Sequence, residues 1–356
     1  MALFGHREFA GHERIIHAHD REVGLRAIIA IHDRSLGPAV GGCRIFPYPD
    51  DEQALCDVLR LSRGMTYKTA LAGLPFGGAK SVIIADPSDK SPDLFRAFAA
   101  AMNSLNGNYW TGEDVNFNAS DVEVLAQFTP YVLGRSIGPG KSGDPSPHTA
   151  AGVFSAMQAA LEHVYGSRDV AGRRIAIQGA GNVGRNLARL VSKAGGTVIL
   201  ADVRAQSAKE IADEIGADVV HPDDIYEQDC DVFAPCAMGS TVNEQTVIRL
   251  KARVVCGAAN NQLSSPEIGR RLLQREIAYV PDFVANAGGI INAAGEYHGH
   301  YDAGEARRRI DEIGSTTARI LEVADKEHRP SSEVADEMAE AILAEARQSR
   351  LQSETN

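Results

Sequence analysis

The glycines at positions 179, 181 and 184 constrain the fold of this 356-residue chain more than any other feature. They follow the apolar run RIAIQ (174–178) directly and precede the helical pattern NVGRNLARLVSKAG. In that context the first glycine permits a tight turn, the second lets a pyrophosphate approach the backbone, and the third lets the helix pack on the strand. We therefore predict a strand–turn–helix unit that binds a dinucleotide through Gly179, Gly181, Asn182, Val183 and Gly184.

An acidic residue, Asp202, follows the next apolar run and stands eighteen positions after Gly184. A carboxylate at that place accepts hydrogen bonds from the hydroxyls of the adenosine ribose and repels a 2′-phosphate, which predicts NAD rather than NADP. The nearby cation Arg204 leaves NADP open, because it could accommodate the phosphate. The alternative for Asp202 itself is an ordinary surface acid.

The fold class expected from the whole pattern is α/β. Beyond residue 148, short apolar runs alternate with helical patterns, which indicates a Rossmann-type doubly wound parallel sheet. The expected strands cover residues 174–178, 197–201, 218–221, 231–234, 253–256 and 277–280. The first part of the chain mixes strands with helices that begin after Asp50 and Ser91, and its expected strands cover residues 25–31, 40–46 and 80–85.

A dense turn signal separates these two parts. Eight of the eleven residues from 137 to 147 are glycine, proline or serine. We predict one domain over residues 1–140, a second over 141–330, and a C-terminal helix over 331–356 whose end, from residue 348, is frayed. The C-terminal helices are expected to pack back on the preceding domains.

Composition excludes several classes of protein. The 36 basic and 47 acidic residues give a net charge of −11, which argues against nucleic acid or an anionic membrane as the main partner. The five cysteines form no C-x-x-C pair, so we expect neither a disulfide framework nor a zinc site. The first twenty residues lack an apolar core, and no stretch is long enough to span a membrane. These features predict a cytoplasmic protein.

Two lysines stand among small or apolar neighbours, Lys68 in GMTYKTALAG and Lys80 in GGAKSVII. Burial lowers the pKa of a lysine amine and allows it to act as a base near neutral pH. The alternative is a lysine whose stem is covered while its amine reaches solvent. A third candidate, Asp114 in NYWTGEDVN, could instead cap a helix near Ser120.

Seven motifs occur in order: GPAVGGCR, RGMTYKTALAGLPFGGAKSVI, NYWTGEDVN, GAGNVG, FAPCAMG, GAANNQL and DFVANAGGIINAAGE. On these motifs the chain resembles the amino-acid dehydrogenase family of glutamate, leucine, phenylalanine and valine dehydrogenases. The resemblance implies reversible, NAD-dependent oxidative deamination of an L-amino acid to its 2-oxo acid and ammonia. It also implies that the first domain binds substrate, carries the catalytic groups and forms a homo-oligomer.

The resemblance assigns roles to the three ionisable residues. Lys80 corresponds to the acid/base, Asp114 to a proton shuttle for the amine, and Lys68 to the anchor of the substrate carboxylate, which backbone amides near Gly41 and Gly42 are expected to help. The resemblance also implies that further residues line the cofactor and substrate, namely Cys236, Ala237, Ala258, Asn260, Asn261 and Asn286. For the three asparagines the alternative is that they are polar loop residues that cap helices. Cys236 is also expected to pack as a small hydrophobe.

The substrate side chain is expected to be apolar. Val40 stands where glutamate dehydrogenases carry a lysine for the side-chain carboxylate, and an unpaired buried carboxylate would cost several kcal/mol. The resemblance places Val40, Gly112, Ile290 and Ala293 in the side-chain pocket. Since Gly112 and Ala293 are small, phenylalanine or another bulky apolar substrate ranks slightly ahead of leucine or valine.

Other functions remain as alternatives. The histidines at positions 12, 17, 19, 298 and 300 lack partners at metal-ligand spacing, so we expect no metal and solvent-facing rings. The chain could be an inactive NAD-binding regulatory protein, although Lys68, Lys80 and Asp114 are all present. A hydroxy-acid dehydrogenase would need a histidine paired with a carboxylate near the nicotinamide, and no histidine occurs in the candidate segments of the first domain.

Overall fold

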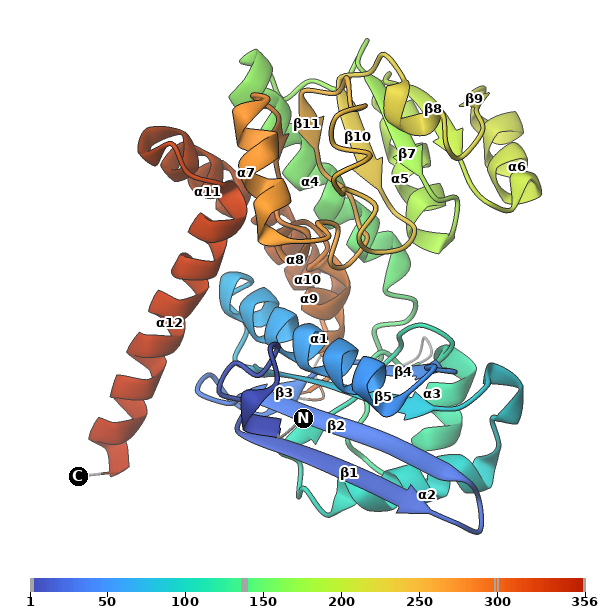
Figure 1. Ribbon diagram of the computed structural model, residues 1–356, viewed down its shortest axis with the longest axis vertical. Coiled ribbons are helices and arrows are strands. Elements are labelled where there is room, and N and C mark those ends of the chain that lie inside the picture. The colour runs from blue at the N-terminus through green and yellow to red at the C-terminus, as the bar shows by residue number, and fades with distance from the viewer. Residues whose placement is uncertain (1–2, 136–139, 298, 300, 355–356) are drawn as a thin grey trace. The chain divides into compact units, whose positions relative to one another are not determined.

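The computed structural model describes residues 3–135, 140–297, 299 and 301–354 (Figure 1). It divides into two compact units. Unit 1 comprises Met1–Asp144, Ala293–Asp302 and Ala339–Asn356, and unit 2 comprises Pro145–Asn292 and Ala303–Met338. The chain thus passes from unit 1 to unit 2 after Asp144 rather than after residue 140. It returns to unit 1 twice, at Ala293–Asp302 and at Ala339–Asn356, so the units are not consecutive segments. Among the described residues, no helix has the length and apolarity needed to cross a membrane.

Unit 1 is built on a mixed six-stranded sheet. Its order is β1 (Arg14–Asp20), β2 (Leu25–Asp33), β5 (Gly77–Ile84), β3 (Ala39–Val40) and β6 (Tyr109–Trp110), with β4 (Cys43–Phe46) also paired to β5. The expected single strand over residues 40–46 is wrong, because Gly41 and Gly42 separate β3 from β4. Strand β5 begins at Gly77 rather than at Lys80, which places Lys80 in its interior.

Helices cover both faces of this sheet. Helix α1 (Asp51–Leu71) packs on β2 and β5, and its first turn is capped by Asp50, whose side chain accepts a hydrogen bond from the N–H of Gln53. Helices α2 (Pro92–Asn103) and α3 (Ala119–Leu125) contribute to the larger apolar cluster of the unit. Ser91 caps α2 as expected.

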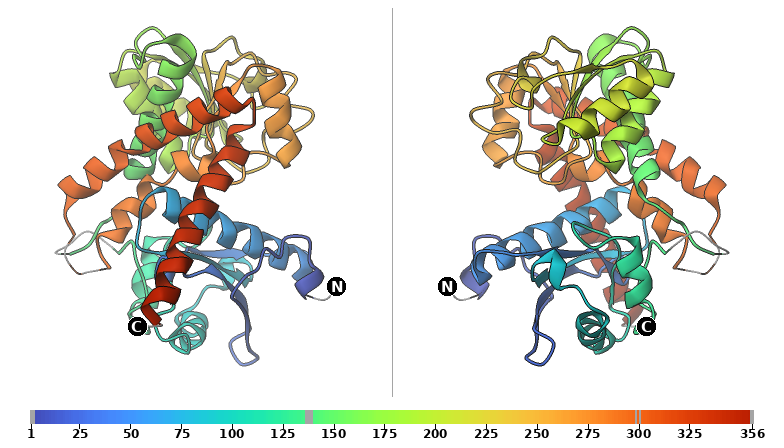
Figure 2. Two further views of the ribbon diagram at one scale, coloured as in Figure 1. Left: turned by 90° about the vertical axis from the view of Figure 1, so that its left-hand side faces the viewer. Right: turned by 90° about the vertical axis from the view of Figure 1, so that its right-hand side faces the viewer.

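The last helix, α12 (Ser331–Glu354), is one continuous helix (Figure 2). The expected fraying from residue 348 stays a prediction, and the described residues up to Glu354 are helical. Arg347 donates to the carboxylate of Asp33 over 2.6 Å, and Arg350 donates to the carbonyl oxygen of Arg34 over 2.8 Å. These long-range contacts within unit 1 stabilise a segment whose composition alone favours fraying.

Unit 2 contains the predicted parallel doubly wound sheet, in the order β12-β11-β10-β7-β8-β9. Strands β7 (Arg174–Gln178) and β8 (Thr197–Ala201) have the predicted bounds. Strand β10 is Val232–Pro235, and the outer strands are shorter than predicted: β9 (Asp218–Val219), β11 (Val254–Val255) and β12 (Ala278–Tyr279). Because β8 and β10 lie on opposite sides of β7, the strand order reverses there, where such sheets bind ligands at the carboxyl ends of the strands.

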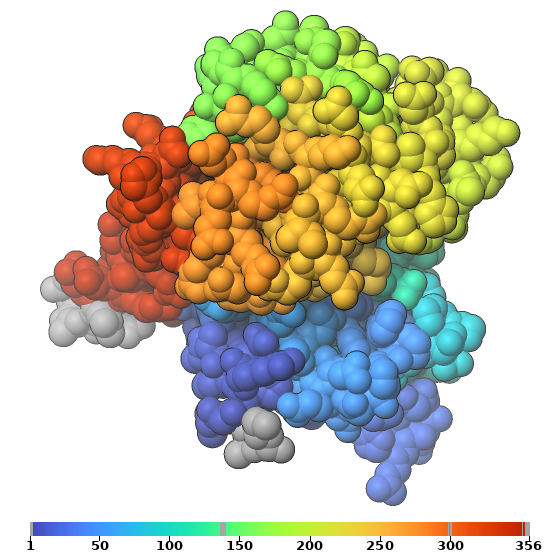
Figure 3. Space-filling view, turned by 45° about the horizontal axis from the view of Figure 1, so that its top comes forward, coloured from blue at the N-terminus to red at the C-terminus, as the bar shows by residue number. Residues whose placement is uncertain are grey.

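The helices of unit 2 flank this sheet. They are α4 (Ser146–Tyr165), α5 (Asn182–Lys193), α6 (Ala205–Ile215), α7 (Pro266–Gln274), α8 (Asp282–Ala285), α10 (Ala303–Asp311) and α11 (Ile313–Glu327), with α9 (Gly288–Ala294) ending in unit 1. Helix α4 packs against α5, α8, α10 and α11, so its small and apolar residues are buried. The yellow and orange segments between α6 and α7 form a continuous part of the surface seen in Figure 3.

Candidate functional site

The catalytic candidates of unit 1 meet at the interior of β5. Lys80 is 3% exposed, so the alternative of an amine that reaches solvent is wrong for this lysine. Its Nζ contacts Oδ2 of Asp114 in an ion pair. The sequence predicts both residues as catalytic, and the structure brings them into direct contact.

Asp114 lies in the turn that follows β6. Its backbone N–H and carbonyl exchange hydrogen bonds of 3.0 Å with those of Phe117, which holds the turn closed. The alternative role as a helix cap is wrong, because Asn118 caps α3. Burial alone would raise the pKa of Asp114, but the positive charges of Lys80 and Arg44 outweigh it and hold the pKa well below its usual value. Asp114 is therefore a carboxylate at neutral pH.

The glycines near this pair serve the packing of the protein itself. A Cβ on Gly41 would stand 1.7 Å from the carbonyl oxygen of Ala79, and one on Gly42 would stand 2.4 Å from that of Glu113. The N–H of Gly41 donates to the carbonyl of Trp110 over 3.1 Å. That amide is therefore already used, so the expectation that amides near Gly41 and Gly42 help to hold the substrate carboxylate excludes it and stays a prediction for the others. A Cβ on Gly112 would meet the carbonyl oxygen of Leu133 at 3.1 Å.

The remaining substrate candidates of unit 1 differ in exposure. Lys68 lies in the last turn of α1 and is half-buried. Val40 in β3 and Ala293 in α9 are buried, at 1% and 8% exposure. Ile290 is half-buried and belongs to unit 2.

Sequence reasoning missed a charged network beside Asp114. Arg44 in β4 donates through Nε to Asp114 over 3.0 Å and through Nη1 to Asp57 over 2.7 Å. The same Asp57 oxygen accepts from the hydroxyl of Tyr48 over 2.6 Å. One signal was present, namely a single charged residue within the strand CRIF of the motif GPAVGGCR.

A second carboxyl group beside Asp114 was also missed. Burial, helped by the nearby carboxylate of Asp144, raises the pKa of Glu113 to about 7, although a hydrogen bond from the backbone of Ala119 opposes that shift. Glu113 therefore gains or loses its proton near neutral pH.

In unit 2 the first and third glycines serve the tight turn and the helix packing that their spacing predicts. Gly179 has a φ of +103°, a conformation that few other residues adopt, and a Cβ on it would stand 2.9 Å from the backbone nitrogen of Ala237. A Cβ on Gly184 would stand 1.9 Å from the carbonyl oxygen of Gly179, so only glycine lets α5 pack here. Gly181, the N-cap of α5, has no neighbour within 4 Å of such a Cβ. Its backbone is accessible, and the N-terminus of the helix favours an anion there.

Asp202 lies at the carboxyl end of β8. Its side chain is 9% exposed and accepts hydrogen bonds from the N–H groups of Ala180 and Arg204, over 2.7 and 2.8 Å. The alternative of a plain surface acid is therefore wrong. The side chain of Arg204 is 73% exposed, and its Nε lies 3.8 Å from the Asp202 carboxylate.

The asparagine candidates lie around the loop that follows β11. The side-chain amide of Asn286 donates to the carbonyl of Ala258 over 3.0 Å and to Oδ1 of Asn260 over 2.8 Å. Asn286 is 6% exposed, and its Oδ1 has no hydrogen-bond partner within the described ranges. Asn261 adopts a left-handed backbone conformation with a φ of 51°. Since a buried carbonyl oxygen without a partner is costly, a ligand donor is the natural complement of Asn286.

Cys236 and Ala237 follow β10 directly, beside Gly179 and Gly184. Burial raises the pKa of the Cys236 thiol to about 12. The thiol is thus a neutral, small apolar group, as expected for packing.

The histidine predictions have mixed outcomes. His17 and His19 are exposed on β1, as expected. His12 is buried and lies within hydrogen-bond distance of the carbonyl of Leu59 and the hydroxyl of Ser62, which corrects the expectation that it faces solvent. His298 and His300 lie outside the described residues. Within the part of the chain that the structure describes, no three His, Cys, Asp or Glu residues are grouped to hold a metal ion.

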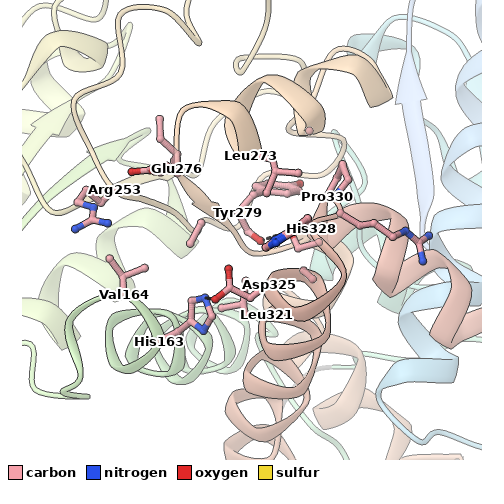
Figure 4. Close-up of a pocket in the computed structure, with 16 residues that line it drawn as sticks. His163, Val164, Arg253, Leu273, Glu276, Tyr279, Leu321, Asp325, His328 and Pro330 are labelled. Carbon is pink, nitrogen blue, oxygen red and sulfur yellow. Dashed lines mark hydrogen bonds and ion pairs between the residues drawn. The ribbon is translucent and has the colours of Figure 1, made fainter.

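Unit 2 also holds a cavity of about 700 Å³ that contains no predicted site residue (Figure 4). It lies beside the amino ends of β11 and β12, whereas the cofactor candidates follow the carboxyl ends of the strands. His163 and Asp325 point toward each other in it, with 3.8 Å between Nε2 and Oδ2. Arg253, Glu276, Leu273 and Leu321 line it with both charged and apolar groups. Its position separates it from the predicted dinucleotide site.

Two family models match the chain. Residues 12–135 match the model described as "Glu/Leu/Phe/Val dehydrogenase, dimerisation domain". Residues 140–205 and 200–350 match the model described as "Glutamate/Leucine/Phenylalanine/Valine dehydrogenase". Together the matches cover most of the chain.

Individual relatives span the full length. The chain is 45% identical to a leucine dehydrogenase of Bacillus subtilis over 353 residues, which are 99% of this chain and 97% of the relative. It is 43% identical to an L-tryptophan dehydrogenase of Nostoc punctiforme (98% of each) and 41% identical to a valine dehydrogenase of Streptomyces virginiae (96% of each). Among solved structures, an L-tryptophan dehydrogenase from Nostoc punctiforme superposes with a TM-score of 0.80 at 41% identity and covers 95% of this chain and 97% of its own.

Proposed function

The chain belongs to the glutamate/leucine/phenylalanine/valine dehydrogenase family and is an amino-acid dehydrogenase, and we propose that it oxidatively deaminates an apolar L-amino acid with NAD. The products are the 2-oxo acid, ammonia and NADH, and the reaction is reversible. The single observation that best supports this proposal is the buried ion pair of Lys80 with Asp114, beside the glycine-rich turn of β3 and β4.

Within unit 1 we assign the chemistry to three side chains. Lys68 holds the substrate carboxylate as a cation. Asp114, which is ionised before the reaction, accepts the proton of the amino group and returns it. Lys80, in contact with Asp114, deprotonates the water that attacks the oxidised substrate carbon, and the ion pair lets the two groups exchange that proton.

Residues of unit 2 fit the cofactor. The N-terminus of α5 with Gly179, Gly181, Asn182, Val183 and Gly184 holds the pyrophosphate, and Asp202 accepts from the ribose hydroxyls. Oδ1 of Asn286, which has no hydrogen-bond partner among the described residues, would accept a hydrogen bond from the carboxamide, beside Ala258 and Asn260. When bound, NAD supplies the acceptor for the hydride that leaves the substrate Cα.

The substrate side chain follows from Val40. Its buried, uncharged side chain offers no partner for a γ-carboxylate, which disfavours glutamate. Relatives named for leucine, tryptophan and valine support both branched-chain and aromatic substrates. The slight preference for phenylalanine that the small Gly112 and Ala293 suggest stays a prediction. We also propose a homo-oligomer, supported by the match to a dimerisation domain.

The test is a panel of initial rates with NAD and NADP. Leucine, valine, phenylalanine, tryptophan, glutamate and lactate are offered at pH 9–10. We expect NADH formation with at least one apolar amino acid. The rate with glutamate should be at least tenfold lower than that rate, and lactate should give no NADH. Binding of NAD without turnover of any amino acid would favour the regulatory alternative, and turnover of lactate alone would favour a hydroxy-acid dehydrogenase.

A further inference from the structure

Arg44 occupies the centre of a row of polar groups on one face of the sheet in unit 1. Strand β4 pairs with β5 so that Arg44 lies opposite Val82, which puts Arg44 and Lys80 on the same face as diagonal neighbours. The row runs from Tyr48 through Asp57, Arg44 and Asp114 to Lys80, and each member contacts the next.

The two oxygens of Asp114 are held by different cations. Oδ1 accepts from Nε of Arg44 over 3.0 Å, and Oδ2 contacts Nζ of Lys80. The side chains of Arg44 and Asp114 are 17% and 11% exposed, so water does little to screen them. Because the guanidinium is planar and is itself held by Asp57, its hydrogen bond fixes the rotation of the carboxylate.

The charge of Arg44 also affects Lys80. A carboxylate in contact with an ammonium group stabilises the charged ammonium and opposes the loss of its proton. Lys80 has to lose that proton to act as a base. A second cation bound to the same carboxylate offsets part of its negative charge. The interaction between the carboxylate and the Lys80 ammonium group is therefore weaker.

We propose that Arg44 is a positioning residue for the proton transfers, which orients Asp114 and offsets its charge so that the carboxylate binds the Lys80 ammonium group less tightly. This inference rests on the proposed roles of Lys80 and Asp114. Asp57, with the hydroxyl of Tyr48 on the same oxygen, holds Arg44 in turn.

Other ionisable groups near the pair come from several elements. They are Asp57 on α1, Tyr48 before it, Cys43 on β4, Tyr109 on β6, Glu113 in the turn after β6, and Asp121 on α3. Burial raises the pKa of Cys43 to about 12 and that of Tyr109 still further, so both stay neutral. Burial and Asp144 raise the pKa of Glu113 to about 7, so its charge is constant at the alkaline end of the pH profile.

The experiment compares the pH profile of kcat between pH 7 and 11 for the intact protein and for Arg44→Gln and Arg44→Lys, with NAD and the best substrate of the panel. For Arg44→Gln we expect kcat at pH 9 to fall at least 30-fold, KM to change less than threefold, and the midpoint of the alkaline rise to move up by about one pH unit. Arg44→Lys keeps the charge but loses the planar fork. It should keep the midpoint within 0.3 units while kcat falls about fivefold.

Unchanged midpoint and kcat in Arg44→Gln overturn the proposal, as does a kcat for Arg44→Lys equal to that of the unmodified protein. Thermal unfolding and NAD binding to unit 2 show whether Arg44→Gln is folded. If it is not, the result with Arg44→Lys alone tests the proposal. The matched control is Arg26→Gln, which removes the exposed ion pair between Arg26 on β2 of the same sheet and Asp51 in the first turn of α1. It should leave the profile unchanged.

Failure of this inference and failure of the proposed function give different results. If Lys80→Ala turns over normally, the assignment of the base is wrong, and the role of Arg44 falls with it. If Lys80→Ala is inactive and Arg44→Gln has the unmodified pH profile, only the role of Arg44 is wrong.

Discussion

The carboxylate of Asp202 accepts a hydrogen bond of 2.7 Å from the backbone N–H of Ala180, at the centre of the glycine-rich turn. The residue that we propose selects the cofactor therefore also holds the turn that we propose binds its pyrophosphate. The other oxygen accepts from the N–H of Arg204, so the carboxylate is fixed in orientation before any ligand binds.

Replacing Asp202 should change the choice of cofactor. In Asp202→Ser we expect KM for NAD to rise about 10- to 100-fold, since a charged hydrogen bond is worth about 1.5–3 kcal/mol. The KM for NADP should fall, because the repulsion of its phosphate is lost and Arg204 lies beside it. Initial rates with both cofactors measure this. Asp213→Ser, an exposed acid on α6, is the control and should behave like the unmodified protein.

Two glycines of one turn should respond differently to alanine. Gly184→Ala brings a methyl group against the carbonyl oxygen of Gly179. We therefore expect the free energy of unfolding to fall by about 1–3 kcal/mol and NAD binding to be lost as well. Gly181→Ala meets no neighbour, so it should unfold at the unmodified temperature but bind NAD more weakly. Thermal unfolding and titration with NAD separate the two effects. Equal stability of both variants would contradict the packing role of Gly184.

Removing the amine of Lys80 should remove turnover while cofactor binding persists. In Lys80→Ala we expect kcat to fall by about 10²–10⁴, the usual contribution of a positioned acid or base. The control is Lys90→Ala, another lysine of unit 1 in an ion pair, 2.8 Å from Asp121. A Lys80→Ala variant as active as Lys90→Ala would refute the assignment.

Glu113 should make the protein less stable as the pH rises. Burial and Asp144 raise its folded pKa from 4.5 to about 7, so the folded state prefers the protonated acid. The resulting destabilisation is absent below pH 4.5, grows up to about pH 7 and stays constant above it. Glu113→Gln, which carries no charge, should thus be more stable than the unmodified protein at pH 8 and equal at pH 4. Thermal unfolding at both values tests this, with exposed Glu22→Gln as control.

The C-terminal helix should depend on the pair of Arg347 with Asp33. Burial would raise the pKa of Asp33, but hydrogen bonds from Arg347 and Ser35 outweigh it and lower the pKa. The pair thus stabilises the protein at neutral pH, and the effect is lost as the pH falls through the folded pKa. We expect Arg347→Met to cost about 1–2 kcal/mol at pH 7, allowing for the half-exposed arginine, and less at pH 3. Denaturant unfolding measures it, and a cost that is independent of pH would contradict the ion pair.

The order of strands and helices in unit 2 could be predicted because its signals are local. The bounds of β7 and β8, the start of α5 and the packing roles of Gly179 and Gly184 all follow from residues that are close together in the chain. Apolar runs bounded by turn residues specify such segments without knowledge of distant contacts. The outer strands lie where the sequence predicts them, but they are shorter than predicted. Pairing with a neighbouring strand decides where a strand ends.

The sequence by itself determined the fold class, the glycine-rich turn before α5, and Lys80 and Asp114 as the candidate catalytic residues. Only the tertiary structure decided their partners. Arg44 meets Asp57 thirteen residues away and Asp114 seventy residues away, and Arg347 of α12 meets Asp33, which is 314 residues away. Periodicity and turn chemistry act over a few residues, whereas these charges interact because folding removes them from water and brings them together, which no local pattern records.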